Sequence, residues 1–220
     1  MLGGCARDEA RFVTATRKIG PYQVYRIRPP EVERVARLLF GLLFFGVALG
    51  LSVEADLGVN PWTVVHQGLS ERLPISIGVA IIVTGLVILS IFPIIDEPIG
   101  LGTVLNVTVI GVFVDITLAI IPDLNSLPIR ILSLGVAPIL IGVGSGFYIG
   151  SGLGPGPRDG IMTALERRGL RVSIARTIVE LTALLIGIVL GGRAGLGTLY
   201  MAGTVGFWVQ FFLRRLRIKE

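Results

Sequence analysis

Asp115 and Glu180 are carboxylates that interrupt apolar stretches of the chain, within Val-Phe-Val-Asp-Ile and Ile-Val-Glu-Leu. A charge near the centre of a bilayer costs about 2.5–3.5 kcal/mol on insertion scales, so such side chains normally face the interior of a helix bundle. His66 is the one histidine of the chain, and histidine titrates near neutral pH without perturbation. Two interpretations stay open for all three residues: local or interhelical hydrogen bonding, or a role in proton or ion coupling. Asn106 lies on the opposite helical face from Asp115 and is a separate polar contact.

Two similar motifs supply the other residues that could do chemistry. Residues 57–62 read Leu-Gly-Val-Asn-Pro-Trp, and residues 153–158 read Leu-Gly-Pro-Gly-Pro-Arg. In each, an acceptable N-cap residue precedes a proline, which at the first helical position gives up only an N–H that would be unpaired anyway. The motifs therefore predict short helices at about 61–72 and 157–168. The candidate substrate-binding residues surround the two helix starts: Asn60, Pro61, Trp62, Gly154, Gly156, Pro157, Arg158 and Asp159.

The two short helices have two alternative placements. Residues 71–72 (Glu-Arg) and 166–168 (Glu-Arg-Arg) end them in charge, which suits helices lying flat at the membrane surface. Alternatively, each helix dips into the bilayer as a re-entrant half-helix, which requires surrounding protein or a water-filled cavity. The positive ends of both helix dipoles then converge and favour an anionic or carboxylate-bearing ligand. Arg158 either binds that ligand or pairs with its neighbour Asp159.

The elements that position these residues occur twice. Three segments return 95 or 96 positions later, in the same order: 57–62 as 153–158, 100–103 as 195–198, and 111–115 as 206–210. Each copy also contains three long apolar stretches. Because three is an odd number, the second copy is inverted relative to the first if every stretch crosses a membrane. Inverted repeats recur in secondary transporters.

The sequence thus predicts an all-α, polytopic membrane protein with six transmembrane helices. A spanning helix needs about 20 mostly apolar residues. Candidate spans lie at about 33–53, 75–92, 101–121, 130–150, 172–191 and 194–213. They form a first three-helix repeat over 33–121 and a second, inverted repeat over 130–213, each with a short interfacial or re-entrant helix. Residues 1–32 and 214–220 are expected to be basic, polar cytoplasmic tails.

Glycine spacing within the predicted spans indicates close helix packing. Gly142, Gly146 and Gly150 recur every four residues in the fourth span, and Gly46 and Gly50 match the first two in the first span. Small residues at this interval let two helices approach closely.

The distribution of positive charge predicts the orientation. Of the 20 lysine and arginine residues, all but Arg72, Arg130 and Arg193 lie on the side of the N-terminus when the chain crosses six times. The positive-inside rule then puts both termini in the cytoplasm, in the cytoplasmic membrane of a bacterium. Membrane lipid is the expected surrounding, and a homodimer is one possible assembly.

Composition excludes several other classes. Hydrophobic residues make up 52% and charged residues 16% of the chain, and the mean hydropathy is +0.81. The net charge of +5 flanks the apolar segments rather than forming one basic surface, so we expect no nucleic-acid partner. One cysteine and one histidine predict neither a disulfide framework nor a metal site. The glycine-rich run at 150–154 fits no nucleotide-binding pattern, so no cofactor is expected.

Residues 55–62, residues 66–70 and residues 148–160 together resemble the bacterial YczE-like membrane proteins of the YczE/YyaS/YitT group. The resemblance covers about residues 33–213. It implies a small multi-pass protein of the bacterial cytoplasmic membrane, and it supplies no binding or catalytic residues to carry over.

These observations favour a small secondary transporter or permease, with a small-molecule substrate and no enzymatic activity. The residues around positions 60 and 158 would line the route, and Asp115, Glu180 and His66 would handle charge. A non-transporting scaffold, whose basic tails and loop at 158–171 bind cytoplasmic proteins or anionic lipid, is the alternative.

Overall fold

The computed structural model describes residues 16–19, 22–25 and 32–216, and those residues form eight helices and two short strands. A helix is present at each of the six predicted spans and at both predicted short helices. The helices are α2 (Val32–Glu54), α3 (Pro61–Arg72), α4 (Ile77–Ile91), α5 (Leu101–Ile120), α6 (Leu127–Gly150), α7 (Pro157–Arg167), α8 (Val172–Val189) and α9 (Leu196–Leu216).

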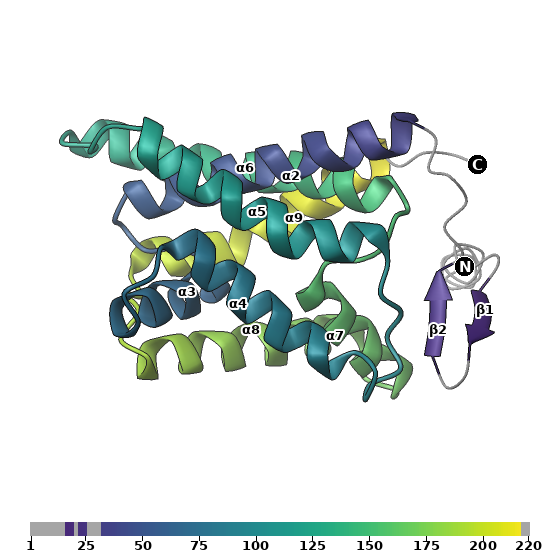
Figure 1. The fold of residues 1–220 in the computed structure, drawn as a ribbon. Helices are drawn as coiled ribbons and strands as arrows, with labels where there is room; N and C mark the ends of the chain where they lie inside the picture. Colours follow the sequence, from purple (N-terminus) through teal and green to yellow (C-terminus); the bar gives the residue numbers. More distant parts are fainter. Residues whose placement is uncertain (1–15, 20–21, 26–31, 217–220) are drawn as a thin grey trace.

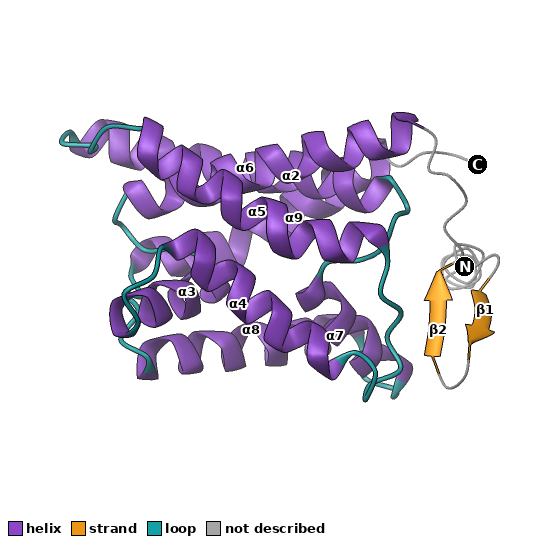
Figure 2. Ribbon diagram, in the orientation of Figure 1, coloured by secondary structure: helices purple, strands orange, loops and turns teal. Residues whose placement is uncertain are grey.

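The N-terminal tail contains a feature that its sequence did not predict. Strands β1 (Thr16–Ile19) and β2 (Tyr22–Tyr25) pair antiparallel, with Thr16 opposite Tyr25 (Figure 2). The other residues of the predicted tail up to 31, and residues 217–220 of the C-terminal tail, lie outside the described residues. The all-α prediction therefore holds for the helical body and not for this pair of strands.

The long helices identify a polytopic helical membrane protein. Among the described residues, α2, α5, α6 and α9 are each long and apolar enough to cross a membrane. The pair α3 and α4 passes the same test only as one unit, and it is bent by 112° at the break between the helices. With 15 residues, α4 alone is about 22 Å long, which is shorter than the roughly 30 Å of a bilayer core.

The helices form two layers (Figure 1). The first contains the long helices α2, α5, α6 and α9, with α2 packed on α6 and α5, and α6 packed on α9. The second contains α3, α4, α7 and α8, with α3 packed on α8 and α4. The buried core lies mainly among the long helices and includes Leu42, Ile110, Ile141 and Met201.

Glycine sets the spacing of the long helices. A Cβ on Gly41 of α2 would lie 2.6 Å from the carbonyl oxygen of Gly144 on α6, and one on Gly144 would lie 2.7 Å from that of Gly41. The predicted glycines serve the same purpose on the flanks of this crossing. A Cβ on Gly46, Gly50 or Gly142 would collide with a side chain of a neighbouring helix, Phe113, Thr117 and Trp208 respectively, and one on Gly146 would be in tight contact with Leu216 and Phe212.

The two ends of the helical body lie together. The Arg37 guanidinium near the start of α2 donates to the carbonyl oxygen of Leu216 at the end of α9, at 3.2 Å. Figure 1 shows these ends on one side of the molecule and the loop between α5 and α6 on the opposite side. The chain therefore returns to the side from which it started.

Each motif loop is tied to the other half of the chain. The carbonyl oxygen of Leu57 accepts from the N–H of Gly197 at 2.8 Å, and that of Leu153 accepts from the N–H of Gly102 at 2.7 Å. The next residues in both loops, Gly58 and Gly154, have φ angles of +111° and +122°, which only glycine adopts readily. Each of these two hydrogen bonds holds one motif loop against the first turn of a helix in the other half of the chain: the loop at Leu57 against α9, and the loop at Leu153 against α5.

Candidate functional site

The start of α3 has the predicted cap. Asn60 is extended, and its side-chain oxygen accepts from the N–H of Thr63 at 3.0 Å, while Pro61 occupies the first helical turn. Asn60, Pro61 and Thr63 are all buried. A helix that begins on buried residues is surrounded by protein at that end, which differs from a helix resting only on a surface.

The start of α7 has the same arrangement of N-cap and proline as α3, but with different side chains. Gly156 is the N-cap and has no side chain to offer, Pro157 follows it, and Asp159 adds an acidic group in the first turn. The hydroxyl of the buried Tyr148 on α6 donates to the Asp159 carboxylate. This contact anchors α7 on the long-helix layer.

Both helix starts reach into the interior. Asn60 lies three positions after Leu57, which is bonded to α9, and Gly156 lies three positions after Leu153, which is bonded to α5. Each loop therefore places its helix start within about 10 Å of that bond. The two starts meet in the interior, because Asn60 and Arg158 line the same two cavities.

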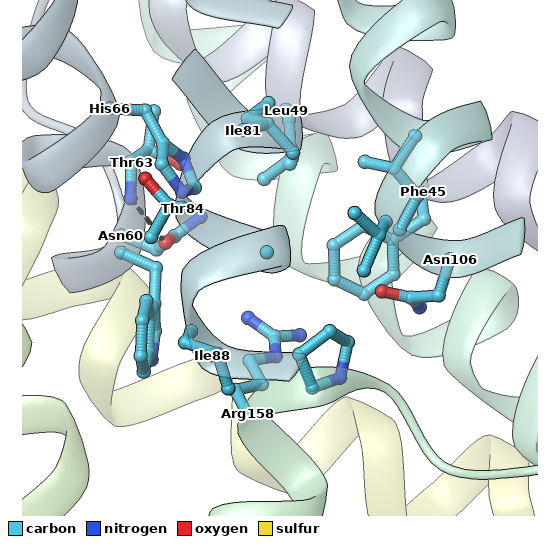
Figure 3. Close-up of a pocket in the computed structure, with 15 residues that line it drawn as sticks. Phe45, Leu49, Asn60, Thr63, His66, Ile81, Thr84, Ile88, Asn106 and Arg158 are labelled. Carbon is cyan, nitrogen blue, oxygen red and sulfur yellow. Dashed lines mark hydrogen bonds between the residues drawn. The ribbon is translucent and has the colours of Figure 1, made fainter. Parts of the chain in front are cut away.

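The smaller cavity has a volume of about 70 Å³ and lies between α2, α3, α4, α5 and the start of α7. Figure 3 shows Asn60, Thr63 and His66 on one side of Arg158 and Asn106 on the other. Thr84 and apolar side chains form the remaining walls.

The larger cavity has a volume of about 320 Å³ and lies between α6, α7, α8, α9 and the start of α3. Its charged lining consists of Arg158, Asp159, Arg176 and Glu180, so two cations face two carboxylates. Glu180, predicted for its position in an apolar stretch, therefore lies at the same site as the second motif.

Arg158 connects the two cavities. Its side chain is 22% exposed, its Nε lies 4.0 Å from Oδ1 of Asp159, and its guanidinium stands 4.9 Å from the centre of the Phe45 ring. The guanidinium donates no hydrogen bond within the described residues. The predicted pairing with Asp159 is thus present but long, and it leaves the guanidinium donors available to a further group.

A row of polar atoms on α3 also lacks partners. Four buried side-chain atoms of α3 make no hydrogen bond to the described residues: Nε1 of Trp62, Oγ1 of Thr63, Nδ1 of His66 and Oε1 of Gln67. Thr63 is 0% and His66 7% exposed. Buried polar atoms in proteins are nearly always bonded to protein or to ordered water, so these atoms point to an occupant. The sequence singled out Trp62 and His66; Thr63 lies three residues before His66, on the same helical face, and that spacing was the available signal.

Asp115 lies elsewhere. Its Oδ2 accepts from the Ser76 hydroxyl at 2.5 Å, and its Oδ1 accepts from the N–H of Gly78 at 2.8 Å. These bonds satisfy the start of α4, and Asp115 lines neither of the two cavities. Both carboxylate oxygens of Asp115 thus have partners, as the hydrogen-bonding interpretation expects, and a coupling role of this residue stays a prediction.

Comparison with known proteins identifies the family. Residues 32–214 match the model of a family of unknown function, DUF6198. The chain belongs to the DUF6198 family. The match spans all eight helices, so the motif loops and both cavities lie inside the DUF6198 region.

Relatives of this DUF6198 protein agree with the membrane assignment. It is 35% identical over 184 residues to an uncharacterized protein of Haemophilus influenzae. This alignment covers 83% of the present chain and 84% of the relative. It is 34% identical over 174 residues to the uncharacterized membrane protein YczE of Bacillus subtilis, with 78% and 80% coverage. The uncharacterized protein YyaS of Bacillus subtilis is 25% identical over 179 residues, with 79% and 89% coverage. The YczE-like resemblance is confirmed.

No solved structure matches this DUF6198 protein. In the part of the chain that the structure describes, no group of three or more histidine, cysteine, aspartate or glutamate side chains is placed to hold a metal ion. The chemistry of the site is that of arginine, carboxylates and unpaired donors around two cavities.

Proposed function

We propose that this protein is a small secondary transporter or permease of the bacterial cytoplasmic membrane, without enzymatic activity. One observation carries the proposal: the starts of two broken helices, from opposite halves of the chain, meet in the interior around cavities that share Asn60 and Arg158. Discontinuous helices whose ends meet at a ligand site are typical of secondary transporters.

We infer that the chain crosses the membrane six times, as two inverted three-helix repeats. Support comes from contacts that recur with the halves exchanged, such as Leu57 with Gly197 and Leu153 with Gly102. The proposal counts α4 and α8 as spans; α8 has 18 residues, about 27 Å, and many of its apolar side chains face outward. The adjacent ends of α2 and α9 fit an even number of crossings, and the positive-inside rule puts them in the cytoplasm.

In this arrangement α3 and α7 are re-entrant half-helices that enter from opposite faces. The buried cap of α3, the buried Pro157 at the start of α7 and the 112° break before α4 support this placement. Irregular backbone at membrane depth needs protein or a cavity around it, and both motif loops are held by helix starts of the other half.

The proposed route passes through both cavities at Arg158. A solute that displaces Asp159 from Arg158 leaves that carboxylate and Glu180 in need of a proton or a cation. Glu180 and Asp159 are therefore the proposed coupling residues, with His66 on the opposite side of Arg158.

The test uses purified protein in proteoliposomes and osmotic swelling followed by light scattering. The solutes are urea, glycine, ethanolamine hydrochloride and sodium acetate at pH 7.5, which represent neutral, zwitterionic, cationic and anionic classes. We expect at least one class to enter faster than in protein-free liposomes, and Arg158→Gln to abolish the excess. Arg168→Gln is the matched control, because Arg168 is exposed at the end of the same helix.

An excess flux in none of the four classes would contradict the proposal. An excess flux that persists unchanged in Arg158→Gln would remove the shared cavities from the route. Deletion of residues 1–30 separates the scaffold alternative, because a transporter should retain its flux without that tail.

A further inference from the structure

We propose that the smaller cavity is a binding site for a short-chain carboxylate, a small organic anion with a hydrocarbon end. This inference names the substrate class of the route proposed above and therefore rests on that function. It is carried by the charge, the unpaired donors, the walls and the size of the cavity.

The charge of the cavity has one sign. Among the described residues that line it, Arg158 is the only one with a formal charge, and no carboxylate is present. The starts of α3 and α7 add the partial positive charge of two helix dipoles. The carboxylates Asp159 and Glu180 lie around the larger cavity instead. The charges that line the smaller cavity therefore favour an anion over a cation, and that anion competes with Asp159, whose Oδ1 lies 4.0 Å from Nε of Arg158.

Three of the four unpaired atoms on α3 belong to side chains that line this cavity and can donate, whereas the fourth, the acceptor Oε1 of Gln67, belongs to a residue that does not line it. The indole N–H of Trp62 can only donate, the hydroxyl of Thr63 can donate, and a neutral imidazole such as that of His66 donates from one nitrogen. Each of these residues has a buried atom without a hydrogen bond in the described part of the chain, and all three line the cavity with Arg158. An ionised carboxylate only accepts hydrogen bonds, with two oxygens that a guanidinium fork can bind together.

Apart from Thr84 and Asn106, the rest of the wall is apolar. It includes Phe45, Leu49, Ile81, Ile88, Val107 and Ile110. A simple inorganic anion leaves this surface in contact with water, while the alkyl end of a short carboxylate covers it. The combination of a polar end and an apolar wall thus favours an amphipathic anion.

The size sets the length of the ligand. One water needs about 10–15 Å³ of such volume, so a cavity of about 70 Å³ holds a few waters or a solute of a few heavy atoms. Acetate and propionate are of this size. Sugars and nucleotides are excluded from the cavity in this conformation.

Tryptophan fluorescence tests the site directly, because one of the two tryptophans lines it. Trp208 lies in an aromatic cluster on α9, and Trp208→Phe leaves Trp62 as the only emitter. This variant, purified in detergent, is titrated with sodium acetate, sodium propionate and sodium chloride. Sodium gluconate, whose anion is too large for the cavity, keeps the ionic strength constant.

We expect a saturable change in Trp62 emission with acetate and propionate, and binding of chloride weaker by at least about tenfold. Arg158→Gln should weaken carboxylate binding by about tenfold or more, because a charged hydrogen-bonding partner is lost. Thr63→Val keeps the side-chain shape and should weaken binding several-fold. Arg168→Gln should bind as the parent does.

Three results would overturn the inference: no saturable response to either carboxylate, equal affinity for chloride, or unchanged binding in Arg158→Gln and Thr63→Val. Gel filtration establishes whether each variant is folded. If Arg158→Gln does not fold, the binding measured with Thr63→Val decides the test. Binding without flux of any solute would contradict the transporter proposal and leave this site standing. Excess flux of only urea, glycine or ethanolamine would support the transporter and contradict the carboxylate site.

Discussion

Glu97 connects the first half of the chain to α7 of the second half through a single side chain. It lies in the loop between α4 and α5 and is 4% exposed. The Thr163 hydroxyl donates to its Oε1 at 2.7 Å, and the Arg167 guanidinium lies 2.6 Å from its Oε2. Burial raises the pKa of Glu97, and the Thr163 hydrogen bond and the Arg167 charge oppose that rise only in part. No pattern in the sequence predicts this contact, because Glu97 and its partners are more than 60 positions apart.

The raised pKa of Glu97 predicts a pH-dependent stability. The folded protein holds this proton more tightly than the unfolded chain, so the contribution is complete below the ordinary glutamate pKa of about 4.5. It is lost as the pH rises through the raised pKa. We expect Glu97→Gln to flatten this part of the profile in thermal unfolding in detergent between pH 4.5 and 7.

A second variant tests the cause of the Glu97 pKa. Thr163→Val removes a hydrogen bond that lowers it, so the loss of stability should move to higher pH. A profile that is the same in the parent and in both variants would contradict the assignment.

The hydrogen bonds of Asp115 predict that substitutions there change the stability of the protein without changing its flux. Asp115 accepts hydrogen bonds at the start of α4, and the loss of a helix cap typically costs about 0.5–2 kcal/mol. We expect Ser76→Ala and Asp115→Ala each to lower the free energy of unfolding by about that amount, because Ser76 is the N-cap of α4 and Asp115 accepts from its hydroxyl. Asp115→Asn keeps an acceptor and should retain flux in proteoliposomes. Loss of flux in Asp115→Asn, with the stability unchanged, would restore a coupling role.

At the scale of elements, the crossing of α2 and α6 depends on the absence of side chains. Gly41 and Gly144 bring two backbones into direct contact, and this contact holds the two halves of the long-helix layer together. Because backbone atoms cannot move aside as a flexible side chain can, an added methyl group must push the helices apart.

This geometry predicts opposite effects for two substitutions on α6. Gly144→Ala places a Cβ 2.7 Å from the Gly41 carbonyl oxygen and should lower the free energy of unfolding by about 1–3 kcal/mol. Gly135→Ala is the matched control: no atom lies within 4 Å of the added Cβ, and alanine favours a helix by up to about 1 kcal/mol. Chemical unfolding in detergent measures both. A Gly144→Ala protein as stable as Gly135→Ala would contradict the close crossing.

At the scale of the whole molecule, the arrangement of helices makes a prediction about the membrane. The start of α2 and the end of α9 lie at one end of the helical body, and the loop between α5 and α6 lies at the other (Figure 1). Exposed apolar side chains are spread over α4, α5, α6, α8 and α9, which suits a surface turned toward lipid.

Labelling of single cysteines in intact cells tests this orientation. In a Cys5→Ser background, Glu33→Cys and Arg215→Cys should react only after the cells are made permeable, whereas Asp123→Cys should react from outside. This result is expected for six spans with both ends in the cytoplasm. Labelling of positions 33 and 215 from opposite sides would contradict an even number of spans.

The sequence by itself determined where the helices lie and what kind of solvent surrounds them. Apolar stretches of about 20 residues indicate membrane helices because each must satisfy its own backbone in lipid. The Asn-Pro and Gly-Pro pairs at 60–61 and 156–157 predicted the starts of α3 and α7, because capping depends on residues within one turn.

Only the tertiary structure decided which of these residues act together. Asn60 and Arg158 are about 100 positions apart and share two cavities, while Asp115 and Glu180, alike as carboxylates in apolar stretches, have different surroundings. The physical reason is that a cavity and its unpaired donors arise from the packing of five or more helices. Local spacing fixes the face of one helix, but not the side chains that the other helices bring to it.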